Sequence, residues 1–577
     1  MYRNTSLYFW INDKMLQNSM VNSSMSIWPC NKSLADDIGV PIVLEYRPYD
    51  SDNMFSDLLT TNLPKCSYCS AFITSAFSID RDKHVQCPFC GNDFQLPNSY
   101  DITYHNFKID QKIDDFSLYL CFVIDLDCSE EYSQVLKVYF SVALKALLPD
   151  MEFMVAFIRK NRFHFVKLFN DIPKIFSFDP SISLFETLEI NSLLNNVKNI
   201  SLIEDLFFCD LHPNSQNNSQ LHEIIDFSNL FSSCPDNTFI KFIMFSPNHV
   251  SNKCASLLSF DWISPIEKNN CQNIDGFYLN PKDIDNIEIQ IQTMIQRYKT
   301  STYAVNVSTQ SFIPKQFEIS PMVCTKPSYR NGSSIIFTIS FPRLFSTFKE
   351  IHIQFVSNYI FILPDGIAKR RTQVNSLKFF TSKDILPILR TVDTSVVWRN
   401  LNSRNEEKEF IKKLLEIYKS KIIDGMPGTT KQFDPFFTLL PNLQWFLKFY
   451  LTNTKPINSK FVIENERKMV RFCQCVSFWE NQENKIEEMS ISYADSNKLL
   501  KSPPIVIVDN CTIIDLFMDD QIIKNSRLDR EIERRILRRF PVPTVRIMPR
   551  ETLFLRWPYK DNYDHIRETF DPTYKKM

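Results

Sequence analysis

The hydrophobic pattern between residues 118 and 158 predicts a strand, a helix and a second strand. An apolar run from Leu118 to Asp125 ends in acidic residues, Tyr132 to Leu148 has helical spacing, and Met154 to Ile158 is apolar again. Two strands joined by a helix predict a right-handed crossover in an α/β sheet. A later apolar run, Phe239 to Phe245, is expected to be a further buried strand of this sheet.

Three short segments further along the chain are rich in β-forming residues and partly alternate apolar with polar positions. They are Tyr303 to Ser308, Ile335 to Phe341 and Ile351 to Val356, and turn residues such as Asn331-Gly332 separate them. Short strands divided by turns in this way are typical of a β-sandwich.

The pattern changes to helical spacing beyond Leu386. Apolar residues then recur on one helical face, namely Phe410, Leu414, Ile417, Tyr418 and Ile422. Near the end of the chain, a strand-like run from Ile505 to Val508 is followed by an arginine-rich helix from Asp529 to Phe540. We therefore expect a helical domain followed by a second, smaller α/β unit.

The composition excludes several classes of protein. The chain has 577 residues, and its seven glycines show none of the spacings of a dinucleotide loop, a Walker phosphate loop or a nucleophile elbow. Its 65 basic and 66 acidic residues give a net charge of −1, so no global charge directs it to nucleic acid. It lacks both an apolar run of about 18 residues and the pattern of a secretory signal, which predicts a cytosolic protein.

Four of the 15 cysteines stand in two C-x2-C pairs that are separated by 17 residues, and they are Cys66, Cys69, Cys87 and Cys90. Two such pairs can close a tetrahedral thiolate cage around Zn²⁺, and four protein ligands favour a structural site over a catalytic one. Gly91 follows the second pair and suits the turn that such a site needs. Basic residues near the pairs are balanced by acidic ones, so we expect no nucleic-acid binding.

Asp125, Asp127 and Ser129 follow the first strand in a D-x-D-x-S pattern. The pattern resembles the metal loop of von Willebrand A-type domains, which has the form D-x-S-x-S. The sequence identifies no partners for this loop in later segments. We therefore favour a solvated strand end over a cation site and keep the cation as the alternative.

Several stretches match a known family in order along the chain. They are Trp28-Pro29 with Val40-Pro41, residues 122–137, residues 353–374, Phe436 to Phe449, and Arg539 to Pro543. Together they resemble the GTPase-activating subunit of the inner COPII vesicle coat. The spacing of the first cysteine pair is closer to the paralogous cargo-selecting arm. That arm therefore stays open as an alternative, as does a structural coat arm without activating activity.

The resemblance implies a multidomain α+β chain. Residues 1–50 are expected to join the β-sandwich, 51–100 to form a zinc ribbon and 101–300 a von Willebrand A-like α/β trunk. The main part of the β-sandwich is expected at 301–385, an all-helical domain at 386–495 and a gelsolin-like α/β domain at 496–577.

The resemblance also implies that the chain is no hydrolase itself but a GTPase activator acting in trans. Its expected partners are the membrane-anchored small GTPase of the coat, a paralogous cargo-binding subunit in a heterodimer, outer-coat subunits and the anionic membrane surface. It would act on the cytoplasmic side of the endoplasmic reticulum membrane and on COPII vesicles. Structural zinc is the one cofactor expected.

An arginine finger in this family lies downstream of the R-F-P-x-P motif, where arginine directly precedes an apolar strand. If Leu553 to Leu555 is that strand here, strict register places Thr552 at the finger position, and Arg550 lies two residues earlier. Arg550 is our candidate and Arg546 the alternative. A third reading is that no arginine finger operates.

Overall fold

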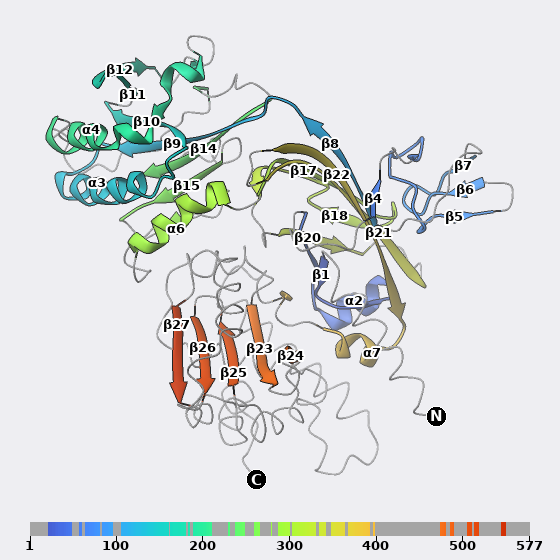
Figure 1. The fold of residues 1–577 in the computed structure, drawn as a ribbon. Helices are drawn as coiled ribbons and strands as arrows, with labels where there is room; N and C mark the ends of the chain where they lie inside the picture. The colour runs from blue at the N-terminus through green and yellow to red at the C-terminus, as the bar shows by residue number, and fades with distance from the viewer. Residues whose placement is uncertain are drawn as a thin grey trace.

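The computed structural model describes the chain in segments. They are residues 21–48, 57–59, 64–80, 84–95, 106–160, 162–179, 183–184, 189–210, 229–230, 237–248, 259–265, 278–279, 287–300, 303–329, 334–341, 348–363, 367–392, 396–397, 473–480, 485–489, 505–510, 513–518 and 544–549. The described strands form five sheets (Figure 1). Residues 398–472, with most of the predicted helical domain, and the predicted helix from Asp529 to Phe540 lie outside the described residues.

The trunk sheet confirms the predicted strand, helix and strand. Strand β9 (Ser117–Asp125) is followed by α3 (Glu130–Lys145) and then by β10 (Glu152–Arg159), which pairs parallel to β9. The predicted later strand is β14 (Thr238–Phe245), and it pairs parallel to β9 on the other side. The last six residues of β9 are buried, as expected for a central parallel strand.

Further strands extend the trunk sheet on both sides. The order is β12-β11-β10-β9-β14-β15-β16, with β13 paired to β10. The added strands are β11 (Arg162–Phe169), β12 (Ile172–Phe178), β13 (Asn195–Asn196), β15 (Ser259–Ile263) and β16 (Tyr278–Leu279). Strands β15 and β16 continue the parallel part, whereas β11 and β12 are antiparallel.

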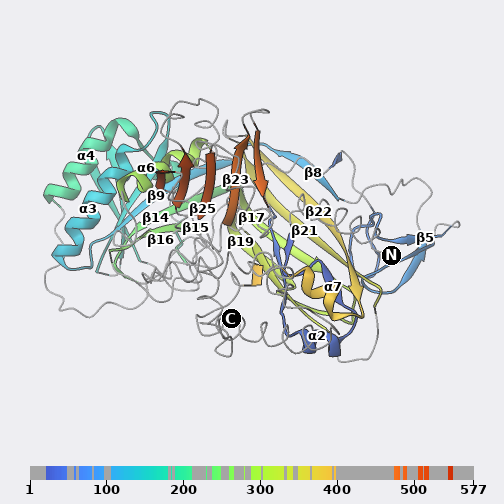
Figure 2. The same ribbon diagram turned by 90° about the horizontal axis from the view of Figure 1, so that it is seen from below.

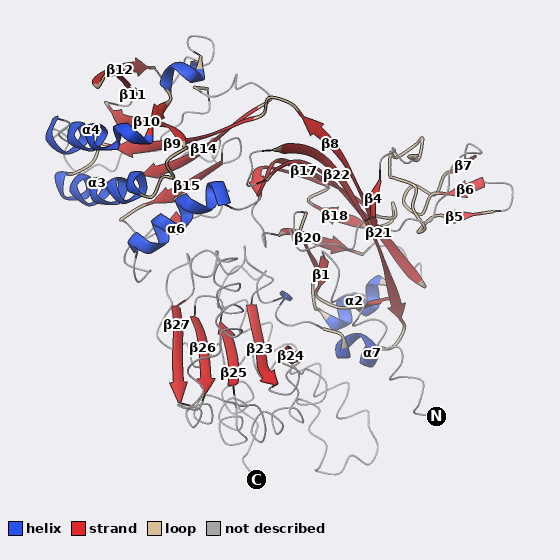
Figure 3. Cartoon of the chain, in the orientation of Figure 1, coloured by secondary structure: helices blue, strands red, loops and turns tan. Residues whose placement is uncertain are grey.

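Helices pack against the trunk sheet and one another. Helix α3 contacts β9, β14, α4 (Ile200–Asp205) and α6 (Ile287–Thr300) (Figure 3). Its first turn carries Glu130 and Glu131 and its last turn Lys145, which suits the helix dipole. Among the described residues, no helix is long and apolar enough to span a bilayer.

Two sheets pack face to face in the β-sandwich. One has the order β19-β17-β21-β22-β8-β4, with β2 paired to β22, and the other has the order β1-β3-β20-β18. The first sheet contains β2 (Ile27–Pro29), β4 (Asp57–Leu59), β8 (Asn106–Ile113), β17 (Tyr303–Phe312), β19 (Val323–Tyr329), β21 (Glu350–Ile362) and β22 (Ala368–Ser382). The second contains β1 (Val21–Ser23), β3 (Ile42–Tyr46), β18 (Glu318–Ser320) and β20 (Ile335–Ser340).

The sandwich draws on more of the chain than the sequence predicted. Strand β8 falls in the segment 101–300 that we assigned to the trunk, yet it pairs with β22 from Asn106 to Ile113. The ribbon and the trunk are therefore both insertions between strands of the sandwich. They lie at its opposite ends (Figure 1, Figure 2).

The N-terminal segment is built into the sandwich core. Trp28 is fully buried and stacks on Phe379 of β22 at 4.3 Å between ring centroids. Between β2 and β3, Asn31 caps the short helix α2 (Lys32–Ile38), because its side chain accepts the backbone N–H of Leu34. Helix α2 contacts β2 and the short helix α7 (Ile385–Arg390), so these small helices lie at one end of the sandwich.

The C-terminal sheet has the order β24-β23-β25-β26-β27. Its strands are β23 (Cys473–Glu480), β24 (Lys485–Met489), β25 (Ile505–Asn510), β26 (Ile513–Met518) and β27 (Thr544–Pro549). Residues 473–480 and 485–489, which we placed in the helical domain, instead form two strands of this sheet. The boundary that we expected at residue 496, between the helical and the C-terminal domain, is therefore too late. Strand β23 lies before it and pairs with β25 in the same sheet.

Candidate metal centre

The two cysteine pairs lie in two loops of the same construction. In each loop the first cysteine's carbonyl accepts a backbone N–H from four residues further on, from Ser70 to Cys66 at 2.9 Å and from Gly91 to Cys87 at 2.9 Å. Ser70 and Gly91 both have left-handed backbone, with φ of 65° and 74°. Gly91 thus has the turn role predicted for it, and Ser70 adopts the same conformation at a higher steric cost.

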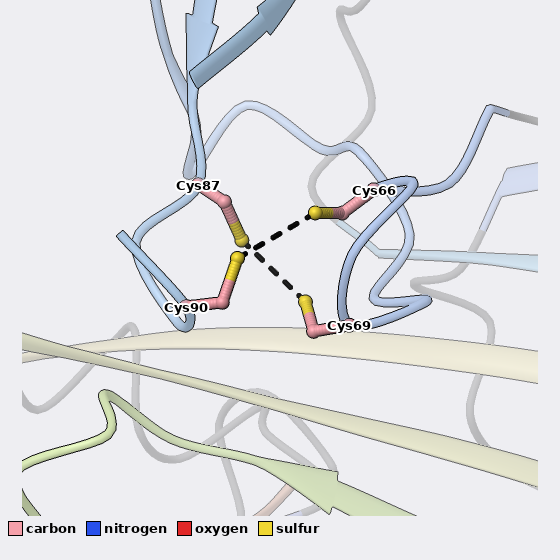
Figure 4. A group of neighbouring side chains, drawn as sticks. All are labelled: Cys66, Cys69, Cys87 and Cys90. Atoms are coloured by element: carbon pink, nitrogen blue, oxygen red, sulfur yellow. Dashed lines mark hydrogen bonds between the residues drawn. The ribbon is translucent and has the colours of Figure 1, made fainter. Parts of the chain in front are cut away.

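The four sulfur atoms converge on one point (Figure 4). Cys66 Sγ and Cys90 Sγ are 3.7 Å apart, Cys69 Sγ and Cys87 Sγ are 3.6 Å apart, and all four lie within 4.8 Å of one another. A tetrahedral Zn²⁺ with Zn–S bonds of about 2.3 Å places its sulfur ligands about 3.8 Å apart. The donor set therefore fits zinc in both chemistry and spacing.

The thiols of Cys69, Cys87 and Cys90 differ in how readily they ionise in the absence of a cation. Burial raises the pKa of Cys69 to about 11, and it also raises the pKa of Cys87. Burial acts in the same direction at Cys90, but the Asn92 backbone N–H and the neighbouring thiols lower its pKa below the ordinary value. Binding of Zn²⁺ would displace the remaining protons and stabilise all four thiolates.

The ribbon that carries these loops packs on the outer face of the sandwich. Its three strands are β5 (Ser78–Ile79), β6 (His84–Gln86) and β7 (Asp93–Gln95). Phe72 contacts Phe107 of β8 edge to face, and Phe89 contacts Phe312 of β17. His84, which lies between the cysteine pairs, is exposed and outside the sulfur cluster.

Comparisons with known proteins agree with this geometry. Residues 63–100 match the family model described as the Sec23/Sec24 zinc finger. The fold of the whole chain is similar to that of the human COPII-coat protein Sec24c, with a TM-score of 0.62 and 11% sequence identity. That alignment covers 96% of this chain and 94% of Sec24c. Residues 63–100 therefore match a zinc finger of the Sec23/Sec24 type, and the chain that contains them has a Sec24c-like fold.

The zinc finger family match assigns the four-cysteine cluster as a structural zinc site, as the cysteine spacing predicted. A von Willebrand factor type A structure from Catenulispora acidiphila is also similar, with a TM-score of 0.35 and 11% identity over 67% of this chain and 88% of that one. That score is too low to define a shared fold. No curated protein matches the chain by sequence.

The D-x-D-x-S segment is not the solvated strand end that we expected. Asp125 is fully buried, and its carboxylate accepts hydrogen bonds from Ser246 and Asn248, which follow β14. Sequence reasoning missed both partners. The signal was present, because Ser246 and Asn248 follow the apolar run that ends at Phe245, and carboxyl ends of parallel strands meet at one edge of a sheet.

The arginine candidates lie in or just after the last strand. Arg546 is in the middle of β27, the outermost of the described strands of its sheet, and it is level with Asp515 of β26 in the parallel register. Arg550 is the residue after β27, and it lies outside the described residues together with Leu553 to Leu555. The assignment of a finger therefore stays a prediction.

Proposed function

We propose that the chain is an inner-coat subunit of COPII that binds the membrane-anchored small GTPase of the coat and stimulates its GTP hydrolysis. The observation that carries the coat assignment is the combination of the Sec23/Sec24 zinc finger with a Sec24c-like fold over 96% of the chain. The activating role rests on the sequence resemblance at the N-terminus and at Arg539 to Pro543.

The proposed mechanism requires one arginine at the active site of the GTPase. A guanidinium group is planar and permanently charged, and it donates two parallel hydrogen bonds to phosphate oxygens. It thereby stabilises the charge that grows on the transferring phosphoryl group, which accelerates hydrolysis by about 10³ to 10⁵. Arg550 is proposed for this role. Its place in the sequence directly after β27, the outermost described strand of the C-terminal sheet, supports the proposal.

Zinc has an indirect part in this proposal. Because the cage is closed by four cysteines, it leaves no position for substrate and stabilises the ribbon instead. We propose that the trunk pairs with a paralogous cargo-binding subunit and that outer-coat subunits and anionic lipid are further partners. The assembly would lie on the cytoplasmic face of the endoplasmic reticulum membrane and on COPII vesicles.

The cargo-selecting arm is the second candidate. The C-x2-C spacing of Cys66 and Cys69 favours it, and the similar solved structure is a Sec24 protein. A GTP hydrolysis assay separates the candidates: the cognate GTPase is loaded with GTP on liposomes, with and without the full chain. An activating subunit accelerates hydrolysis, whereas a cargo-selecting subunit leaves the rate unchanged and binds cargo peptides. A structural coat arm also leaves the rate of hydrolysis unchanged, but it binds the GTPase and shows no binding of cargo peptides.

A further inference from the structure

The buried carboxylate of Asp125 stands at the carboxyl edge of the trunk sheet, where a cation would lie in a domain with a metal loop. Its Oδ1 atom accepts the backbone N–H of Asp127 at 2.9 Å. Its Oδ2 atom accepts the hydroxyl of Ser246 at 2.6 Å and the amide of Asn248 at 2.7 Å. Donors therefore surround both oxygens.

The amide of Asn248 bridges two parts of the D-x-D-x-S loop. Its Nδ2 atom lies 2.7 Å from Asp125 Oδ2 and 3.4 Å from the backbone oxygen of Asp127. The backbone N–H of Asn248 also donates to the Ser246 hydroxyl at 2.9 Å, which fixes the turn after β14. The backbone oxygen of Asp127 can only accept, so the NH₂ group is the end of the amide that faces the loop.

Asp127, the second acidic residue of the loop, accepts a hydrogen bond from the backbone. Asp127 Oδ1 accepts the N–H of Lys160, the residue after β10, at 2.8 Å. Leu126 donates its N–H to Ile158 of β10 at 3.0 Å, so the loop is held to β10 on one side and to the turn after β14 on the other. The Asn248 amide nitrogen thus completes a clamp between three parallel strands.

We infer that Asn248 takes the place of a divalent cation at this edge, and that aspartate in its place would let the edge bind one. The amide supplies donors to the oxygens that a cation would attract, without adding charge. With Asp at this position, two carboxylates would face each other at hydrogen-bond distance and repel. Mg²⁺ or Mn²⁺ would relieve that repulsion and find ligands in Asp125, residue 248, the Ser246 hydroxyl and the Asp127 carbonyl.

The test measures thermal unfolding of the full chain in buffer freed of divalent metal by a resin, which leaves the tightly bound zinc of the ribbon in place. The Tm of the wild type is expected to be unchanged by Mn²⁺ or Mg²⁺. The Asn248→Asp variant is expected to have a lower Tm without metal and to regain about 5 °C at saturating Mn²⁺. Asn248→Ala loses the clamp without gaining a ligand, so its lower Tm should not respond to metal.

A second measurement covers the case in which Asn248→Asp folds poorly without metal. The variant is then purified in Mn²⁺, dialysed, and compared with the wild type for bound manganese, which is expected only in the variant. Addition of Asp125→Asn should abolish that binding. The inference is overturned if wild-type protein shows a Mn²⁺ response that Asp125→Asn removes, or if Asn248→Asp neither binds Mn²⁺ nor is stabilised by it.

Discussion

Gln354 and Phe72 are joined by two hydrogen bonds that fasten the zinc ribbon to the sandwich. The backbone N–H of Phe72 donates to Gln354 Oε1 at 2.8 Å, and Gln354 Nε2 donates to the Phe72 carbonyl at 2.8 Å. The side-chain amide thus satisfies a residue of the ribbon in the way that a neighbouring strand would. Gln354 Nε2 also reaches Ser376, which contacts Thr74 of the ribbon.

Replacement of Gln354 by Leu should therefore loosen the ribbon. Gln354 is fully buried and Phe72 is 4% exposed, so both backbone groups of Phe72 would lose their partner where water cannot replace it. We expect a loss of about 1 to 3 kcal/mol in the free energy of unfolding, measured with urea. Gln86→Leu, at an exposed position on β6, is the matched control. Unchanged hydrogen exchange at the Phe72 amide in Gln354→Leu would argue against the anchoring role.

The zinc site makes a second prediction. Natively purified protein should contain one zinc ion in the cage of four cysteines, and Cys87→Ser should lose it. Because the ribbon covers Phe107 and Phe312 of the sandwich, loss of metal should expose this apolar face and increase binding of a hydrophobic dye. Elemental analysis and dye fluorescence measure the two effects. Cys128→Ser, outside the cluster, should retain zinc, and metal-free wild type would contradict the assignment.

Gly91 and Ser70 occupy equivalent positions, and their substitutions should have opposite effects. A Cβ atom added at Gly91 meets nothing within 4 Å, so the cost of Gly91→Ala comes from its positive φ alone. We expect Gly91→Ala to lower stability by about 1 to 2 kcal/mol. Ser70→Gly should relieve the same strain and raise stability by up to about 1 kcal/mol. Thermal unfolding with zinc present measures both, and equal effects of the same sign would refute the strain argument.

His164 should make the trunk sensitive to acid. Burial lowers its pKa, its ring stacks on Phe157 at 4.7 Å, and Nε2 lies 3.2 Å from the Arg159 carbonyl. Since that carbonyl only accepts, Nε2 carries the proton and Nδ1 accepts from Ser177 at 2.7 Å. The folded pKa lies below the unfolded value, so stability from this residue is lost as the pH falls below about 6.5. His164→Gln should flatten the stability profile between pH 5 and 7, and an unchanged profile would contradict this account.

The sequence predicted local elements better than their assembly. Continuous apolar runs identified β9, β10 and β14, because central parallel strands are buried on both faces, and helical spacing identified α3, because a helix of this kind buries one face. The zinc cage could be predicted equally well, because both halves of the ligand set are local C-x2-C pairs. The pairing of β8 with β22 could not be predicted from the sequence. It joins segments more than 250 residues apart through backbone hydrogen bonds, which do not require particular residue types.

Long-range polar contacts explain the remaining misses. Gln354 looks like an ordinary strand residue in the sequence, and only the packing of the ribbon reveals its two bonds to Phe72. For Asp125, the sequence predicted the position at a strand end but not the burial of the carboxylate. That burial depends on how the turn after β14 folds over Asp125. Without Ser246 and Asn248 in place, a carboxylate after a strand is indistinguishable from a solvated one.

The arginine finger is the sharpest prediction of the proposed function. Arg550→Ala should keep binding of the GTP-loaded GTPase on liposomes, measured by flotation, and lose most of the stimulated hydrolysis. Arg550→Lys should rescue poorly, because an ammonium cannot donate the two parallel hydrogen bonds of a guanidinium. Arg546→Ala is tested beside it, because Arg546, which lies within β27 and level with Asp515, is the alternative candidate.

The pattern of loss identifies the residue that acts. A loss in Arg550→Ala of about 10³-fold or more, with normal hydrolysis in Arg546→Ala, supports Arg550. The reverse result means that Arg546 reaches the GTPase and that the register chosen from Leu553 to Leu555 is wrong. If the wild type stimulates hydrolysis and neither substitution reduces it, the catalytic group is supplied elsewhere, and β27 only presents a binding surface. Because flotation measures binding separately, a fall in hydrolysis that follows a fall in binding cannot be mistaken for loss of a finger.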